Sequence, residues 1–277
     1  MIHAELGDAA IAVQFRGAGK PLLLIHGTVL ADGLLPLAEA LRSRREHLIL
    51  RYHRRGYGRS SRMSVPWSVE QHAKDAARLL EHLALQKADV VGYSAGAAVA
   101  LQMALDFPRM TGAVVLIEPW FSAQAPQFQA FESKLAAIQG IYEYGDTAAA
   151  MQEYLTFFCG PDYRNVLDNV FSPRWLEMAN RDAHTIFVNE LSALRLWRLD
   201  RGIAERLTTP LLLVRGSRTS PYQAEVHAEL AEWLPEAETV VVPDAGHLVP
   251  TERPAALARS IARFLVRNPL HIAASAG

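Results

Sequence analysis

The segment Gly92-Tyr93-Ser94-Ala95-Gly96 places a serine between two glycines, directly after a short apolar run. Flanking glycines permit a sharp turn from a strand into a helix, which presents the serine hydroxyl at the strand's carboxyl end above the helix N-terminus. A serine hydroxyl becomes a nucleophile near neutral pH only when a base within hydrogen-bond reach takes its proton. The pattern makes Ser94 a candidate nucleophile, and an idle serine in a tight turn is the alternative.

Two histidines follow other apolar runs and could complete a site around that serine. His26-Gly27 ends the run Leu22–Ile25, and His247 follows Asp244 in the loop between the run Thr239–Val242 and the last helical stretch. An imidazole in such a loop can face a serine from the next loop and accept its proton. We therefore expect His247 to be the base and His26 to orient its own loop.

A further stretch, Arg55-Gly56-Tyr57-Gly58-Arg59-Ser60, adds to this pattern. With the serine turn and the two histidine turns in this order, the chain resembles the α/β-hydrolase superfamily over almost its whole length, in its lidded, esterase-like branch. The resemblance implies an α/β fold with a mostly parallel, doubly wound sheet and an inserted helical cap. It also implies that the backbone N–H groups of Ala95 and Thr28 stabilise an oxyanion, with Val29 as the alternative to Thr28.

The sequence departs from the family pattern at two places. Where many relatives have an Asp before the Arg-Gly turn, this chain has His53, and we expect a local change in hydrogen bonding there. The loop Gly216–Pro221, which follows the penultimate strand and usually carries the triad acid, contains no carboxylate. The acid must come from elsewhere, because the imidazole needs a carboxylate on its other nitrogen.

Glu118 is the candidate for that acid. It directly follows the apolar run Ala113–Ile117, the strand after the serine's own, and residues at strand carboxyl ends converge on the crevice where such sheets bind ligands. Some branches of the superfamily are similar in placing the acid on this strand. Asp244 is the alternative acid, and a Glu118 held by Arg195 or Arg198 would be a structural carboxylate instead.

The rest of the chain supplies the elements that must position these residues. Short apolar runs bounded by turn residues indicate strands buried on both faces, as in a parallel sheet. They alternate with stretches of helical periodicity, which predicts βαβ units with helices on both faces. Residues 2–15 are expected to form an antiparallel hairpin at the sheet edge. The expected strands are 21–26, 48–52, 88–91, 113–117, 210–214 and 239–242, and the expected helices are 34–41, 69–83, 95–107, 223–233 and 253–265.

The stretch from Trp120 to about Arg206 shows no convincing apolar strand and indicates several helices. We expect residues 1–119 and 207–277 to form the two parts of the hydrolase core and residues 120–206 to form a helical cap, or lid. The cap is rich in aromatic residues, most of which should fill its own core and some of which should line an apolar substrate cavity. The residues expected to contact substrate are Tyr93 (with core packing as the alternative), Trp120, Phe121 and Val249.

Composition excludes several classes of protein. The 277 residues are 50% hydrophobic and 21% charged, which rules out a disordered or fibrous chain. Lys+Arg 28 against Asp+Glu 29 gives a net charge of -1, so neither a nucleic acid nor a membrane is expected as partner. Cys159 is the only cysteine and no histidine pair has metal-ligand spacing, so we expect no disulfide, metal or cofactor. Residues 1–7 show no secretory signal, and we expect a cytoplasmic protein whose oligomeric state stays open.

These observations predict a serine hydrolase that cleaves a small, largely apolar ester, lactone or thioester through Ser94, His247, Glu118 and an acyl-enzyme. A serine rather than an aspartate at position 94 argues against epoxide hydrolase or haloalkane dehalogenase chemistry. Two alternatives stay open. One is cofactor-independent C–C bond hydrolysis, lyase, cyclase or oxygenase chemistry by the histidine–acid pair on the same fold, and the other is a non-catalytic ligand receptor.

Overall fold

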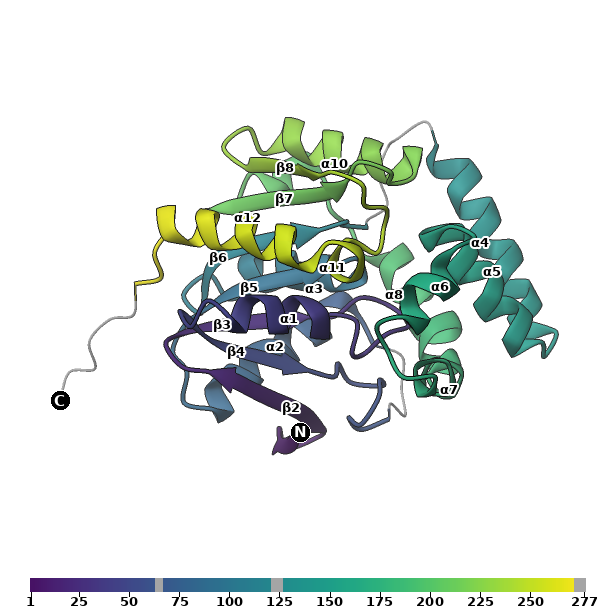
Figure 1. Ribbon diagram of the computed structural model, residues 1–277, viewed down its shortest axis with the longest axis horizontal. Coiled ribbons are helices and arrows are strands. Elements are labelled where there is room, and N and C mark those ends of the chain that lie inside the picture. Colours follow the sequence, from purple (N-terminus) through teal and green to yellow (C-terminus); the bar gives the residue numbers. More distant parts are fainter. Residues whose placement is uncertain (63–66, 121–126, 272–277) are drawn as a thin grey trace.

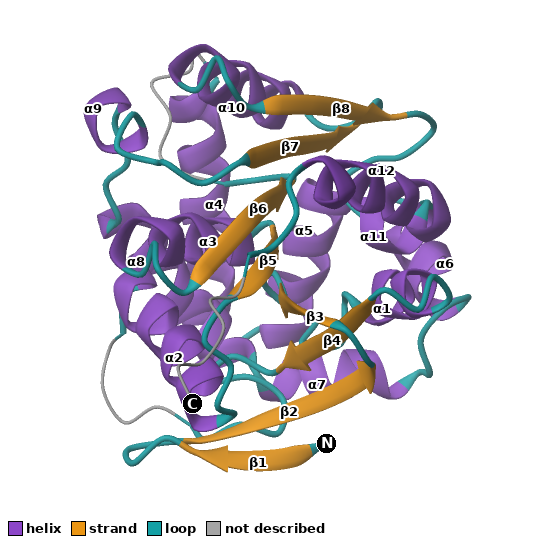
Figure 2. Cartoon of the chain, turned by 90° about the vertical axis from the view of Figure 1, so that its left-hand side faces the viewer, coloured by secondary structure: helices purple, strands orange, loops and turns teal. Residues whose placement is uncertain are grey.

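The computed structural model describes residues 1–62, 67–120 and 127–271 (Figure 1). In this part of the chain eight strands form one sheet: β1 (Ile2–Glu5), β2 (Ala10–Gly17), β3 (Lys20–Ile25), β4 (His47–Tyr52), β5 (Ala88–Tyr93), β6 (Thr111–Ile117), β7 (Leu211–Gly216) and β8 (Glu238–Val242). Figure 2 shows their order from bottom to top, β1-β2-β4-β3-β5-β6-β7-β8. The pairs β1–β2 and β2–β4 are antiparallel and the other neighbours are parallel. The predicted α/β fold with a mostly parallel sheet is confirmed.

Side chains of the central strands alternate between two apolar clusters, one on each face of the sheet. In β3, Leu22 and Leu24 belong to one cluster, while Leu23 and Ile25 belong to the other. Because both faces are covered, the strands have continuous apolar sequences rather than alternating ones. One face is covered by α1 (Leu35–Arg42), α11 (Val249–Glu252) and α12 (Pro254–Arg267), and the other by α2 (Val69–His82), α3 (Ala95–Asp106) and α10 (Pro221–Trp233) (Figure 1).

Helices occupy the described residues between β6 and β7, and they gather beyond one end of the sheet (Figure 1). Asp146 begins α5 by accepting a hydrogen bond from the Ala149 N–H, and Gly160, with a φ of +83°, follows its last residue. The elements are α4 (Phe128–Glu143), α5 (Thr147–Cys159), α6 (Tyr163–Asp168), α7 (Arg174–Arg181), the π-helix η1 (Thr185–Glu190), α8 (Leu191–Leu196) and α9 (Arg201–Ala204). The division of the chain into a core and a cap domain stays a prediction. None of the described helices is both long and apolar enough to cross a membrane.

Candidate active site

Ser94 stands in the turn between β5 and α3, with φ 54° and ψ -122°. Its N–H donates to the Ile117 carbonyl at 2.9 Å, so the turn continues the hydrogen bonding of β5 with β6. Both flanking glycines are required by space. A Cβ on Gly92 would collide with the main-chain oxygen of Gly96, and a Cβ on Gly96 would collide with that of Ile25. The sharp turn predicted from the two glycines is therefore present.

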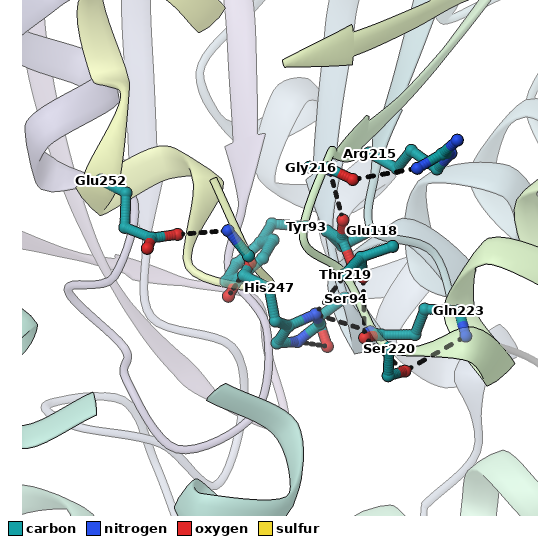
Figure 3. Close-up of polar contacts among 11 residues, drawn as sticks. Tyr93, Ser94, Glu118, Arg215, Gly216, Thr219, Ser220, Gln223, His247 and Glu252 are labelled. Carbon is teal, nitrogen blue, oxygen red and sulfur yellow. Dashed lines mark hydrogen bonds and ion pairs between the residues drawn. The ribbon is translucent and has the colours of Figure 1, made fainter. Parts of the chain in front are cut away.

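The His247 imidazole lies between Ser94 and Glu118 (Figure 3). Its Nε2 is 3.2 Å from Ser94 Oγ, and its Nδ1 is 3.1 Å from Glu118 Oε2. All three residues are buried. The Tyr93 hydroxyl donates to the His247 carbonyl at 3.0 Å, and the rings of Tyr93 and Phe158 lie beside the imidazole. The structure thus brings three residues of the expected triad together in a hydrogen-bonded row.

Glu118 is held by the loop that lacks a carboxylate of its own. The N–H of Gly216 donates to Glu118 Oε1 at 2.7 Å, and the hydroxyl of Thr219 donates to Oε2 at 2.5 Å (Figure 3). Hydrogen bonds to a carboxylate favour its charged form. The loop after β7 therefore supplies donors for an acid that comes from β6.

Neither of the other arrangements considered for the acid is found. The side chain of Asp244 is 77% exposed, and its carboxylate lies 3.6 Å from Arg253. Arg195 binds Glu132 and Gln139, and Arg198 donates to the Arg195 carbonyl, rather than to Glu118.

Backbone strain is concentrated around this site. Val29, Ser94, Glu118 and Asp244 have φ between 49° and 69°, in the left-handed region, and they follow β3, β5, β6 and β8 in turn. Such residues cost about 1–3 kcal/mol each and persist only where the surrounding structure holds them. Hydrogen bonds from the N–H groups of Ser94 and Glu118 to the adjacent strands do so here.

The expected oxyanion donors border the same space. Ala95 is the first residue of α3, so its N–H has no carbonyl partner within the helix. Thr28 and Val29 both line the cavity beside Ser94, and the choice between their N–H groups stays open. His26 is completely buried and its pKa is held well below the ordinary value, chiefly by burial. Its two ring nitrogens contact the Gly27 carbonyl at 2.7 Å and the Arg54 N–H at 2.9 Å, as expected for a residue that orients the loop.

The cavity beside Ser94 is small, about 30 Å³, which is room for about one or two water molecules. Of the expected substrate contacts, Tyr93 lines it, whereas Trp120 and Val249 do not. Trp120 packs against Phe131 and Phe158, and Val249 lies in the apolar cluster with α12. Phe121 lies outside the described residues. The lining is Thr28, Val29, Leu30, Tyr93, Ser94, Tyr154, Leu155, Phe158, Cys159, His247 and Leu248.

Four lining residues come from one helix, α5. Tyr154 and Phe158 are two of the aromatic residues of the predicted cap, while Leu155 and Cys159 were not predicted to line the cavity. The spacing of four within each pair puts them on one face of the helix, and this spacing was a signal that sequence reasoning could have used. Gln223 was also missed, although its amide lies 2.6 Å from His247 Nδ1.

The turn that follows β4 is one of the places where the helices between β6 and β7 contact the rest of the chain. Arg54 and Glu190 form an ion pair of 2.7 Å in which both side chains are 0% exposed, and Arg54 also donates to the Gly27 carbonyl. The Thr185 hydroxyl donates to the Gly56 carbonyl at 2.9 Å. His53 accepts the Arg59 N–H through Nδ1 and meets Asp32 through Nε2.

Among the described residues, no group of three or more His, Cys, Asp or Glu side chains is arranged to hold a metal ion.

Comparison with known proteins identifies the family to which the chain belongs. Residues 22–260 match the model of the alpha/beta hydrolase family. The chain is 25% identical to a 2-(acetamidomethylene)succinate hydrolase of Mesorhizobium japonicum, with 95% of this chain and 94% of that protein covered. It is 26% identical to a 2-hydroxymuconate semialdehyde hydrolase of a Pseudomonas species, with 94% of each covered. Its fold is similar to that of an enol-lactonase from Burkholderia xenovorans, with a TM-score of 0.78, 21% identity, and coverage of 95% and 99%.

Proposed function

Because the chain belongs to the alpha/beta hydrolase family, we propose that it is a serine hydrolase that cleaves a small, largely apolar ester, lactone or thioester. The observation that carries the proposal is the buried row Ser94–His247–Glu118, with 3.2 Å and 3.1 Å between the hydrogen-bonding atoms. The likeness to the hydrolases named above supports the reaction class, and the apolar lining of the cavity supports the substrate class.

The row of side chains gives each residue a separate task. His247 Nε2 takes the proton of Ser94 Oγ as that oxygen attacks the substrate carbonyl, and Glu118 accepts the Nδ1–H and stabilises the imidazolium that forms. The N–H groups of Ala95 and Thr28 bind the developing oxyanion. His247 then protonates the leaving group, and a water activated by the same imidazole hydrolyses the acyl-enzyme. As proposed, the reaction needs these protein groups and one water molecule.

The cavity favours short, uncharged acyl groups. Leu30, Leu155 and Phe158 supply apolar surface, and the lining contains no Lys, Arg, Asp or Glu. Since the space holds only about one or two waters, admitting a substrate requires side chains of α5 to move. A cap that opens and closes over Ser94 would perform this movement.

A second candidate reaction is hydrolysis of a C–C bond by the same serine and histidine. One relative that matches over 94% of this chain is named a 2-hydroxymuconate semialdehyde hydrolase. Turnover of such a semialdehyde, together with no turnover of the ester and lactone named below, would favour this second reaction.

Ser94→Ala provides the test. A fluorophosphonate probe should label the wild-type protein at Ser94 alone, and Ser94→Ala should lose labelling and about 10⁵-fold or more of the turnover of p-nitrophenyl acetate and a short lactone. Ser192→Ala, which changes an exposed serine of α8, is the matched control and should keep both. Labelling or turnover that survives in Ser94→Ala shows that the nucleophile is wrong. Tight binding of an apolar ligand without turnover by the wild type identifies a receptor instead.

A further inference from the structure

Gln223 lies in the first turn of α10. Its side chain reaches the Nδ1 edge of the His247 ring, away from the Nε2 atom that meets Ser94 (Figure 3). The residue is only 2% exposed. One end of its amide, Nε2, lies 2.6 Å from His247 Nδ1. The other end, Oε1, lies 3.1 Å from the Thr219 hydroxyl and 3.2 Å from the Ser220 hydroxyl. The His247 Nδ1 therefore has two polar neighbours, Glu118 and this amide.

A half turn about the last side-chain bond exchanges the amide nitrogen and oxygen, and the two settings demand different histidine tautomers. When the amide N–H₂ faces His247, Nδ1 must accept, so the proton of the neutral imidazole sits on Nε2. In that setting Nε2 cannot take the proton of Ser94. The Nδ1 lone pair also faces the Glu118 carboxylate at 3.1 Å, two acceptors without a hydrogen between them.

With the amide carbonyl turned to His247, the hydrogens of the imidazole, of the amide and of the Thr219 hydroxyl all find acceptors. The Nδ1–H is shared by Glu118 and the amide oxygen, and Nε2 is free to take the proton of Ser94. The amide N–H₂ donates to the hydroxyl oxygens of Thr219 and Ser220. Thr219 in turn donates its own hydrogen to Glu118 Oε2. This second setting is the one that general-base catalysis requires.

We propose that Gln223 is a positioning residue that sets the tautomer of His247 by presenting its amide carbonyl to the Nδ1–H beside Glu118. The inference rests on the proposed function, in which His247 is the base for Ser94. It also assigns a task to the loop after β7: Thr219 and Ser220 orient the amide, and Thr219 at the same time holds the carboxylate. The histidine is thereby oriented from both α10 and β6.

The direct measurement is the ¹⁵N NMR spectrum of the full-length protein labelled at histidine, with His247 assigned from its loss in His247→Gln. Near neutral pH the neutral imidazole of the wild type should be the Nδ1–H tautomer. An Nε2–H tautomer would show that the amide N–H faces the ring, and would overturn the proposal. This spectrum needs no turnover, so a protein with the Nδ1–H tautomer that hydrolyses no ester would contradict the proposed function alone.

Exchange of the acid and the amide provides a rescue experiment. Glu118→Gln should lose most of the activity, and Glu118→Gln/Gln223→Glu should regain at least 10-fold in kcat at similar KM, because a carboxylate again accepts the Nδ1–H. The control is Glu118→Gln/Gln139→Glu, which has the same net charge but adds its carboxylate on α4, and it should regain nothing. A folded exchange variant no more active than Glu118→Gln overturns the proposal, and the wild-type spectrum decides the case if that variant does not fold.

Discussion

Two buried carboxylates, Glu118 and Glu190, are held in place by different kinds of partner. Glu118, after β6, meets the N–H of Gly216, the hydroxyl of Thr219 and the imidazole of His247. Glu190, on the side of β3 and β4, meets the guanidinium of Arg54 at 2.7 Å with neither side chain exposed. Glu118 thus meets uncharged donors and the imidazole, whereas Glu190 is paired with a cation that joins two parts of the molecule.

The surroundings of the two carboxylates explain why we assign a catalytic role to Glu118 and a structural role to Glu190. Burial raises the pKa of the Glu190 carboxyl, and the charge and hydrogen bond of Arg54 oppose the rise. Removing one partner of such a buried ion pair lowers the stability of the fold strongly, whereas replacing both partners together changes it little. The donors around Glu118 come from main chain and hydroxyl groups, which give direction without cancelling the charge. The predictions that follow separate catalytic from structural carboxylates, beginning with the largest effect.

Replacing the Glu118 carboxylate with a neutral amide should remove most of the proposed activity. Glu118→Gln should lower kcat by about 10⁴-fold, the order seen when a triad carboxylate becomes an amide. Ester turnover, with urea unfolding beside it, checks the prediction, and the fold should stay intact. Activity within 10-fold of the wild type would mean that Glu118 is not the acid.

Removing the Arg54 cation should lower the stability of the fold. Arg54→Met leaves the Glu190 carboxylate buried without its partner, so the free energy of unfolding should fall by about 3–5 kcal/mol. Arg54→Met/Glu190→Met removes both charges and should recover most of the loss. Urea denaturation of the two variants and the wild type measures this. A single variant that loses less than about 1 kcal/mol contradicts the assignment of the pair as an anchor.

A third buried carboxylate, Asp89, sharpens the comparison because it accepts a main-chain hydrogen bond, from the Ala113 N–H at 2.8 Å. Burial raises the pKa of Asp89 to about 6, from an ordinary value of 3.8. Between these values the folded state holds a proton that the unfolded chain releases, so stability falls as the pH rises. The contribution is complete below pH 3.8 and is lost as the pH rises through about 6.

Asp89→Asn should remove that part of the pH dependence. The rise in the pKa of Asp89 on folding corresponds to about 3 kcal/mol of unfolding free energy, at about 1.4 kcal/mol for each pKa unit. Unfolding free energies at pH 4 and pH 8 should therefore drop less in the variant than in the wild type. Equal slopes in the two proteins would show that Asp89 titrates normally.

The smallest effect is expected at Asp244, whose carboxylate is exposed. Asp244→Asn keeps a residue type that tolerates the left-handed backbone found there. Turnover should stay within about twofold, and stability within about 0.5 kcal/mol. A loss comparable to that of Glu118→Gln, measured with the same ester, would exchange the roles of the two acids.

Sequence reasoning reached the strands, the helices that cover them and the turn at Ser94, because apolar periodicity and paired glycines are local signals. It also selected Glu118, since residues that end neighbouring parallel strands must meet at one edge. It missed Gln223, because the sequence does not tell which way a residue in the first turn of α10 will point. It expected Trp120 and Val249 in the cavity, but their side chains pack into the apolar clusters, and α5 covers Ser94 instead.

The order in which the chain is synthesised has a consequence for the site. His247 follows Ser94 by 153 residues, and at about 5–20 residues per second the ribosome makes the serine roughly 8–30 s before the histidine. The nascent chain thus carries the proposed nucleophile before its proposed base has been synthesised. During most of that interval β6 is also the open edge of the sheet, since β7 begins only at Leu211. Unpaired edges of this kind are where chains aggregate and chaperones bind, so the yield of folded protein depends on how the cell protects this edge until β7 has been synthesised.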